Sequence, residues 1–295
     1  GTSGVGLADM LNLLLGRDTD GAGAGHQLTR DVLIGSRIPR LAAGIAVGFA
    51  LGVAGALLQS LARNPLASPD TLAVTAGAYF AVTAVAVFGL AVPIWASGAV
   101  AFVGGLAAGG VVLLLAGGAG TSTTRLVLAG SAVMLAVQAG TATLLILFPE
   151  QTTGLFAWGS GSLSQLGLTA FGWAAPVVVA SVAWAVLMGR RLDLLAVGDD
   201  TARVLGVPVS STRIAGVVLA VLLTAAAVTL AGPIGFVGLC APVLVRLAGR
   251  ATPGVQRHAV LIPASGLAGA LIVVLADAII RALVGPEAAH AIPTG

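Results

Sequence analysis

Lysine is absent from this chain, and charged residues of every kind are scarce. Asp, Glu, Arg and Lys together make up 8% of the residues, whereas hydrophobic residues make up 58% and the mean hydropathy is +1.06. A soluble globular domain carries about a quarter of its residues as charged side chains, so this composition excludes that class. All 14 basic residues are arginine, and the net charge of +3 is too small and too dispersed for nucleic-acid binding. The sequence therefore predicts a polytopic membrane protein with no nucleic-acid partner.

Cysteine clusters and nucleotide-binding motifs are also missing. Cys240 is the single cysteine, which excludes an internal disulfide, and no group of Cys and His residues has the spacing of metal ligands. The phosphate-binding pattern G-x-x-x-x-G-K-[ST] does not occur. We therefore expect no metal, no cofactor and no nucleotide hydrolysis on this chain.

Long uncharged runs are present and divide the chain into membrane-length segments. Residues 41–62 carry no charge, and at about 1.5 Å of rise per residue they can cross a hydrocarbon core of about 30 Å. Within this run Gly44, Gly48 and Gly52 recur every four residues and form a face on which another helix can pack closely. The Gly/Ser-rich part at 159–167 is expected to form a re-entrant turn or a short helix. Seven spans and one shorter, broken segment are predicted: 41–62, two spans within 71–124 divided at 89–93, 126–149, 173–188, 214–230, the broken 231–247, and 259–284.

The positions of arginine predict the orientation of these spans. Loops rich in Lys and Arg face the cytoplasm. If the first span runs inward, residues 1–36 lie outside the cell and nine of the 14 arginines fall on the inner side. These nine are Arg63, Arg125, Arg190, Arg191, Arg203, Arg213, Arg246, Arg250 and Arg257. We therefore predict a multi-pass membrane protein, in contact with lipid, whose arginine-rich side faces the cytoplasm.

The longest charged loop, at 190–213, falls on the same inner side. Its pattern predicts two short helices, because Asp199 and Asp200 favour a helix start and Gly206 with Pro208 favours a break. A cytoplasmic helix pair held between two spans can transmit force from a soluble partner to the bundle. An ordinary solvated loop remains an equally good interpretation of this pattern.

Four segments together resemble a known family. They are RIPR (37–40), QSLARNPLASPDTLAVTAGA (59–78), LAVGDDTARVLGV (195–207) and AGPIGFVGLCAPVLVRL (231–247). They resemble the FecCD-type permeases, the membrane subunits of ABC importers for iron-siderophore complexes, haem and vitamin B12. The resemblance implies an all-α transmembrane bundle of the type II ABC importer permease kind, forming a single domain over 1–295. The family has ten helices, and this chain is expected to lack the first and the last.

Two departures from the family pattern accompany the resemblance. EAAHAIPTG at 287–295 stands where relatives carry an ELPVG-like sequence, and Val243 stands where they often carry His after the proline matched by Pro242. The second departure removes any role for an imidazole at that position.

The resemblance implies that basic residues on the outer face dock an extracytoplasmic substrate-binding protein. The matching positions are Arg37, Arg40 and Arg281, and charge pairs at a wet rim steer association and fix register. Interfacial anchoring and snorkelling are the alternative for Arg37 and Arg40. For Arg281 the alternative is an ion pair with Asp277, one helical turn earlier.

The resemblance also implies that the cytoplasmic loop couples the permease to two ABC ATPase subunits, which hold the ATP and magnesium. The expected coupling residues are Asp199, Asp200, Ala202, Arg203, Leu205 and Gly206. A second permease chain, identical or related, completes the family's assembly. This chain is then a transport subunit and not an enzyme.

Polar groups within the spans are the candidates for the translocation path, which the resemblance places between two permease chains. They are Gln59, Gln138, Ser131 and Thr141; each could instead bond to a neighbouring helix or to its own backbone. The irregular segment with Gly232, Pro233, Gly235 and Gly238 is expected to border the gate, because broken backbone is tolerated in a membrane only inside protein or along a cavity. The resemblance further implies a wide path without a tight specificity pocket.

The function implied is inward movement of an iron-siderophore complex, haem or vitamin B12 by alternating access. An iron chelate or haem is favoured over vitamin B12 by analogy alone. An ion-coupled secondary transporter is the alternative, but it requires buried acids, and Asp277 is the only candidate within a predicted span. A membrane-embedded enzyme is disfavoured because His26, His258 and His290 all fall outside the predicted spans.

Overall fold

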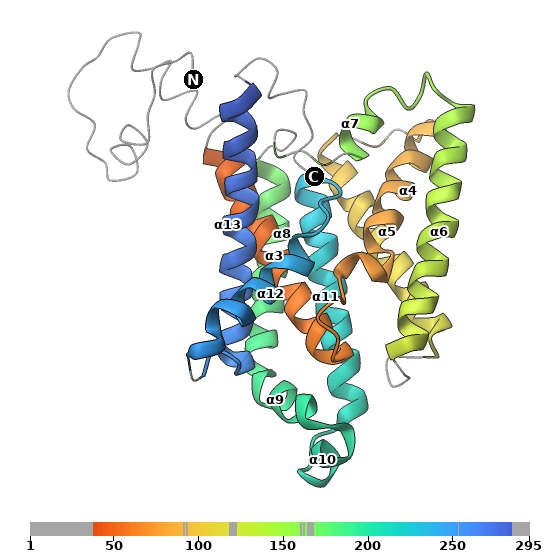
Figure 1. Cartoon of the computed structure of the whole chain (residues 1–295). Coiled ribbons are helices and arrows are strands. Elements are labelled where there is room, and N and C mark those ends of the chain that lie inside the picture. Colours follow the sequence, from red (N-terminus) through yellow and green to blue (C-terminus); the bar gives the residue numbers. More distant parts are fainter. Residues whose placement is uncertain are drawn as a thin grey trace, which may run out of the picture.

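The computed structural model describes residues 38–90, 92, 94–117, 123–159, 161, 163, 168–252 and 254–284. Every regular element within these residues is helical, which confirms the all-α prediction (Figure 1). The α-helices are α3 (Ile38–Ala62), α4 (Val74–Val87), α5 (Ile94–Leu115), α6 (Thr123–Leu147), α7 (Leu155–Gly159), α8 (Leu168–Leu187), α9 (Gly189–Val197), α10 (Asp199–Val204), α11 (Val209–Ala231), α12 (Val237–Ala248) and α13 (His258–Val284). Two 3-10 helices, η2 (Pro69–Leu72) and η3 (Gly249–Ala251), complete the described elements.

Each predicted span corresponds to a helix, although the lengths differ. Within the described residues, α3, α5, α6, α11 and α13 are long and apolar enough to cross a membrane, whereas α4, the apolar part of α8 and α12 are shorter. The span predicted from residue 71 begins as an α-helix only at Val74. Pro69 opens the 3-10 turn η2 and Ala73 has a left-handed backbone with φ 56°, so the chain turns twice before α4 starts. Figure 1 shows α4 beginning near the middle of the bundle's height.

Helix α3 forms the centre of the core and packs against α13, α11 and α12. The predicted small-residue face is confirmed on its contact with α13. A Cβ atom at Gly48 would lie 2.3 Å from the carbonyl oxygen of Gly269, and one at Gly52 would lie 2.1 Å from that of Ser265. Only glycine lets the two backbones approach this closely.

The described helices form two groups that lie side by side (Figure 1). The first group contains α3, α8, α11, α12 and α13. The second contains α4, α5 and α6, and α6 packs mainly on α4, α5 and η2. Helix α6 exposes most of its surface, while α11 is buried over most of its length. Burial therefore differs strongly between α6 and the two central helices α3 and α11.

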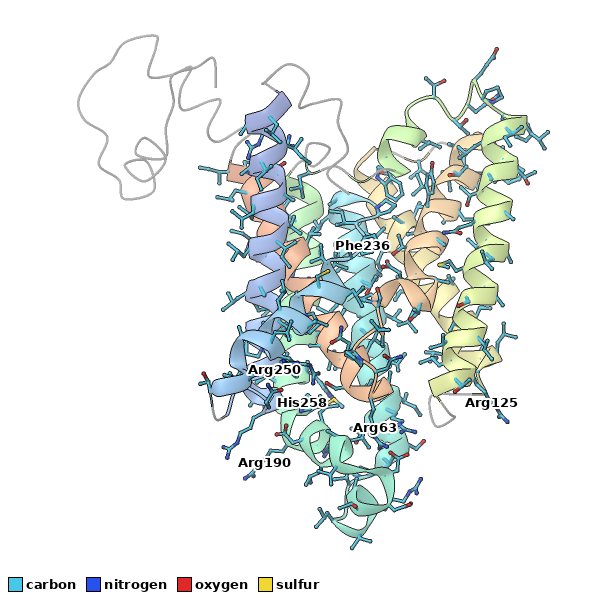
Figure 2. All side chains as sticks on the ribbon, viewed as in Figure 1. Arg63, Arg125, Arg190, Phe236, Arg250 and His258 are labelled. Atoms are coloured by element: carbon cyan, nitrogen blue, oxygen red, sulfur yellow. The ribbon has the colours of Figure 1, made fainter. Side chains whose placement is uncertain are left out.

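Arginine gathers at one end of the bundle, as predicted. Figure 2 shows Arg63, Arg125, Arg190 and Arg250 at the same end as α9 and α10. The loop at 190–213 is indeed a pair of short helices: α10 starts at Asp199, ends at Val204, and is separated from α11 by the segment with Gly206 and Pro208. The patterned loop is therefore ordered into helices and is not an irregular connection.

Candidate functional site

A cavity of about 400 Å³ lies in the second group of helices. Its described walls come from η2, α4 and α6, with Gly159 at the end of α7 and Pro233 after α11. Five of the described lining side chains are polar: Asp70, Thr75, Tyr79, Gln138 and Thr141. The other described lining residues are Ala76, Met134, Ala142, Leu145, Gly159 and Pro233.

Three of the predicted path residues meet on this wall. They are Gln138 and Thr141 from α6, and Pro233 from the segment after α11. The Thr141 hydroxyl donates to the Val137 carbonyl at 3.0 Å and keeps its lone pairs for another partner. Gln138 is exposed, and its amide makes no hydrogen bond within the described part of the chain. The Gln138 amide on one side of the cavity therefore has no hydrogen-bond partner among the described residues.

Two other predicted path residues lie elsewhere. Gln59 is buried, and its amide nitrogen donates to the Leu239 carbonyl at 3.1 Å, so it joins α3 to α12. This is the helix-to-helix bond that was the alternative interpretation for a glutamine in a span. Ser131 lies on α6 but does not line the cavity. The structure thus separates these two residues from Gln138 and Thr141.

The predicted irregular backbone between α11 and α12 is confirmed. Gly232 has φ 70° and Phe236 has φ 64°, and Phe236 is 75% exposed at the start of α12. Figure 2 shows Phe236 near the middle of the bundle's height. A Cβ atom at Gly238 would lie 2.6 Å from the Pro69 ring, so the break before α12 packs directly on η2. Gly235 is exposed, and a Cβ atom added there would meet no atom within 4 Å.

Sequence reasoning missed Asp70 and Tyr79. Burial raises the pKa of Asp70, and the Ser68 hydroxyl, which donates to its Oδ2 at 2.9 Å, only partly offsets this. The Tyr79 hydroxyl donates to the Leu155 carbonyl at 3.1 Å. Asp70 was overlooked because it precedes a predicted span and looked like its polar end. The sequence signal for Asp70 was Pro69, because a proline favours a turn, and a turn here keeps the next residues close to the bundle.

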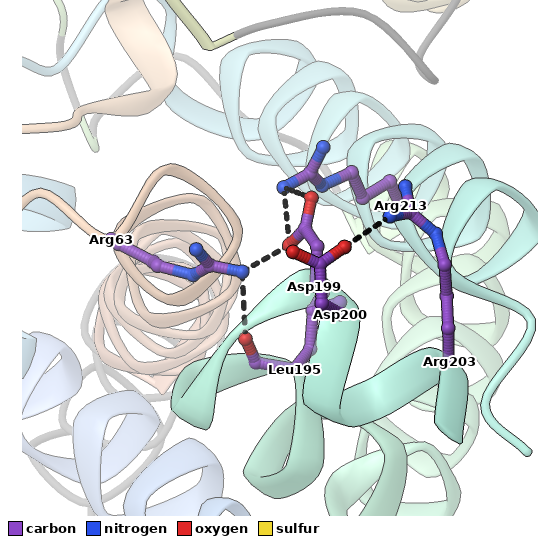
Figure 3. Close-up of polar contacts among 6 residues, drawn as sticks. All are labelled: Arg63, Leu195, Asp199, Asp200, Arg203 and Arg213. Atoms are coloured by element: carbon purple, nitrogen blue, oxygen red, sulfur yellow. Dashed lines mark hydrogen bonds and ion pairs between the residues drawn. The ribbon is translucent and has the colours of Figure 1, made fainter. Parts of the chain in front are cut away.

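Asp199 fixes the helix pair to the bundle (Figure 3). It pairs with Arg63 at the end of α3, and with Arg213 on α11, whose Nη2 lies 2.9 Å from Asp199 Oδ2. Arg63 also donates to the Leu195 carbonyl at 3.0 Å, on α9. One carboxylate therefore connects the helix pair to two membrane spans.

The other predicted coupling residues divide by exposure. Ala202, a residue of α10, is fully buried. Asp200 and Arg203 pair with each other at 2.8 Å on the surface, and Leu205 and Gly206 are exposed beside them. The outer face of α10 therefore presents both charged and apolar contacts to a partner.

A second connection joins α9 to the core. His258, the first residue of α13, lies between Asp193 on α9 and Ser60 on α3, with ring nitrogens 2.6 Å from Asp193 Oδ1 and 2.7 Å from Ser60 Oγ. Arg246 of α12 donates to the same hydroxyl at 3.1 Å. His258 is therefore buried, and the network of His258, Asp193, Ser60 and Arg246 joins four helices.

The predicted docking residues meet around one carboxylate at the end of the bundle away from α9 and α10. Arg40 donates twice to Asp277 Oδ1, at 2.9 and 2.6 Å, and Arg281 lies 2.6 Å from Asp277 Oδ2. The predicted pair of Asp277 and Arg281 is confirmed. Arg40 is only 8% exposed, whereas the Arg281 side chain is 41% exposed. Arg37 lies outside the described residues, so Arg281 is the accessible docking candidate among those described.

Comparisons with known proteins agree with this architecture. The sequence profile of the FecCD transport family matches residues 1–292. The chain is 39% identical to the ferric enterobactin transport system permease protein FepG of Escherichia coli (strain K12) over 263 residues, which cover 88% of this chain and 76% of that protein. It is 33% identical to the hemin transport system permease protein HmuU of Yersinia pestis, covering 85% of this chain and 75% of that protein.

A solved structure shows the same fold. It is a metal-chelate type ABC transporter in an inward-facing conformation, with a TM-score of 0.79 and 26% sequence identity over 91% of this chain and 84% of that one. The family match extends over nearly the whole chain, and the two relatives are matched over three quarters of their length. This chain therefore belongs to the FecCD transport family, and it is a membrane permease and not itself an enzyme.

Proposed function

We propose that the chain is the permease subunit of a binding-protein-dependent ABC importer, which moves an iron chelate into a bacterial cell by alternating access. The observation that carries this proposal is the attachment of α9 and α10 to the bundle. Asp199 and Asp193 tie the pair to α3, α11 and α13, while the outer face of α10 stays exposed. A soluble partner that pushes on α10 would therefore move membrane helices.

The proposed cycle starts at the other end of the bundle. A loaded substrate-binding protein docks on the outer rim, where Arg281 offers an accessible guanidinium and Arg37 and Arg40 are the further predicted contacts. Two separate ATPase subunits bind ATP and magnesium and close, and they press on Asp200, Arg203, Leu205 and Gly206. The helix pair passes this movement to the spans, and a second permease chain, identical or related, forms the other wall of the path.

The arginine-rich end is proposed to face the cytoplasm of a multi-pass protein in the inner membrane. The alternative of an ion-coupled secondary transporter is weakened at Asp277, because this acid is neutralised by two arginines and has no free charge to offer an ion. Iron-siderophore complexes are the first cargo to test because several relatives are named for ferric enterobactin or ferric citrate; haem and vitamin B12 follow, since others are named for hemin and cobalamin.

Uptake of radiolabelled ferric siderophores into proteoliposomes that hold the permease and its ATPase tests the proposal. Uptake should require both ATP and the binding protein. Arg281→Glu should lower uptake by weakening docking, while Arg250→Glu, at the opposite end, should leave the affinity for the binding protein unchanged. Uptake driven by a proton or sodium gradient without ATP would overturn the proposal in favour of a secondary transporter.

A further inference from the structure

We propose that the cavity beside Asp70 is a cargo subsite that accepts a cationic, hydrogen-bond-donating group, with Asp70 as its specificity-determining residue. This inference rests on the proposed import function and deepens it by naming the charge of the cargo. It departs from the expectation that the path has no specificity pocket.

The charge on the cavity wall has one sign. Among the described residues that line the cavity, Asp70 is the single charged one, and no described arginine or histidine joins it. No ion pair with Asp70 forms within the described residues, and its Oδ2 accepts only the Ser68 hydroxyl. A half-buried carboxylate without a basic partner is less well stabilised than one that is paired. A cationic group entering the cavity would supply the missing partner.

The neutral polar groups on the wall mostly offer lone pairs. The hydroxyls of Tyr79 and Thr141 already donate to backbone carbonyls, so both face further partners only as acceptors. Gln138 offers one carbonyl oxygen and one amide group, and the Thr75 hydroxyl offers one donor and two lone pairs. The wall therefore has more acceptors than donors, which suits an ammonium or another donor group and disfavours an anion.

The burial of Asp70 supports the same conclusion. The carboxylate is half-buried, and within the described residues its side-chain oxygens accept a single hydrogen bond, from the Ser68 hydroxyl, so most of its negative charge is left without a partner. A bound cation would compensate it, and a second negative charge would make the site less favourable still. A highly anionic complex should therefore avoid this part of the path.

The size of the cavity limits which part of a cargo can enter it. Ligand pockets for whole small molecules span roughly 300–1,000 Å³, so a cavity of about 400 Å³ is large enough for one arm of a bulky chelate but small for all of it. Gln138 on the cavity wall is exposed, so the cavity can be reached from the surface of the described part of the chain, and an arm that projects from a chelate in the path can reach Asp70.

Equilibrium binding to the purified permease with its ATPase, in lipid nanodiscs without ATP or binding protein, tests this proposal. Three radiolabelled iron probes differ in charge. They are a ferric trihydroxamate with a pendant ammonium (ferrioxamine B), the same complex N-acetylated to remove that charge, and an anionic ferric tris-catecholate. The first should bind about tenfold more tightly than the second, the difference between a charge-assisted and a neutral hydrogen bond. The tris-catecholate should bind most weakly.

Two substitutions should shift this order in opposite directions. Asp70→Asn should remove the preference for the ammonium probe, while Gln138→Glu should increase it by adding a second carboxylate to the wall. The matched control is Glu150→Gln, which removes an exposed carboxylate that does not line the cavity and should leave all three affinities unchanged.

The proposal is overturned if the wild-type complex fails to prefer the ammonium probe, if none of the probes binds, or if Asp70→Asn leaves the preference intact. Failure of the import function gives a different result. Charge-selective binding without ATP-dependent uptake would retain the subsite and reject the importer, whereas ATP-dependent uptake without charge selectivity would retain the importer and reject the subsite.

Discussion

His258 and Asp193 are joined twice: the backbone N–H of His258 donates to Asp193 Oδ1 at 2.9 Å, and ring nitrogen Nδ1 lies 2.6 Å from the same oxygen. The carboxylate of α9 thus caps the first turn of α13 and also orients the imidazole that reaches Ser60. A movement of α9 cannot leave α13 and α3 in place without breaking these bonds.

We predict that Asp193→Ala uncouples ATP hydrolysis from uptake. The loss of hydrogen bonds to a charged acceptor costs about 1.5–3 kcal/mol, so the cargo moved per ATP should fall roughly tenfold or more while hydrolysis by the partner continues. The measurement is the ratio of uptake to phosphate release in proteoliposomes. Asp200→Asn, which breaks only the surface pair with Arg203, is a control for charge loss on this helix pair. An unchanged ratio in Asp193→Ala would show that this link transmits no force.

We predict that Asp277→Ala strongly destabilises the bundle. Arg40 and Asp277 have side chains only 9% and 5% exposed, and removal of the acid leaves a buried guanidinium without its partner. Breaking such a pair costs about 3–5 kcal/mol, and thermal unfolding of the solubilised protein measures the loss. The double variant Asp277→Ala with Arg40→Met should recover much of the stability. If the single variant melts like the wild type, the pair contributes little.

We predict that Gly52→Ala destabilises the contact between α3 and α13. The added methyl group would lie 2.1 Å from the Ser265 carbonyl oxygen, which forces the two helices apart at a typical overpacking cost of about 1–3 kcal/mol. Gly110→Ala on α5 is the matched control, because a Cβ atom there meets nothing within 4 Å. Thermal unfolding should separate the two variants, and equal melting temperatures would contradict the close approach.

We predict that Asp70→Asn changes the pH dependence of stability. Burial raises the pKa of Asp70 above its ordinary value of 3.8. A carboxyl with a raised pKa in the folded state favours folding below that ordinary value, and this contribution is lost as the pH rises through the raised pKa. The melting temperature of Asp70→Asn should therefore rise relative to the wild type as the pH increases from about 4 towards neutrality. A difference that stays constant with pH would indicate an ordinary pKa.

The features that the sequence predicted well are those set by local spacing. Glycines at four-residue intervals lie on one face of any α-helix, so the packing face of α3 followed directly from Gly48 and Gly52. The two short helices at 190–213 followed from acids at a helix start and from a Gly/Pro break, both of which act within a few residues. Hydropathy located the spans because it, too, depends only on residues that are close together in the sequence.

The features that the sequence did not predict depend on contacts between distant segments. Gln59 and Gln138 are both single glutamines within apolar runs, yet one joins two helices and the other faces a cavity. Only the position of α12 beside α3 decides between these outcomes. His258 lies just before the predicted span 259–284, and the sequence does not show that Asp193 and Ser60 lie close to both of its ring nitrogens inside the protein.

Helix α6 carries Gln138 and Thr141, and it is also among the least buried of the long helices. Because it rests mainly on α4, α5 and η2, tilting it away from them sacrifices little buried surface and leaves the packing around α3 undisturbed. We therefore expect the α6 wall of the cavity to move more readily than the helices packed around α3. Such a wall would let the cavity widen around a bulky group while the rest of the protein keeps its shape.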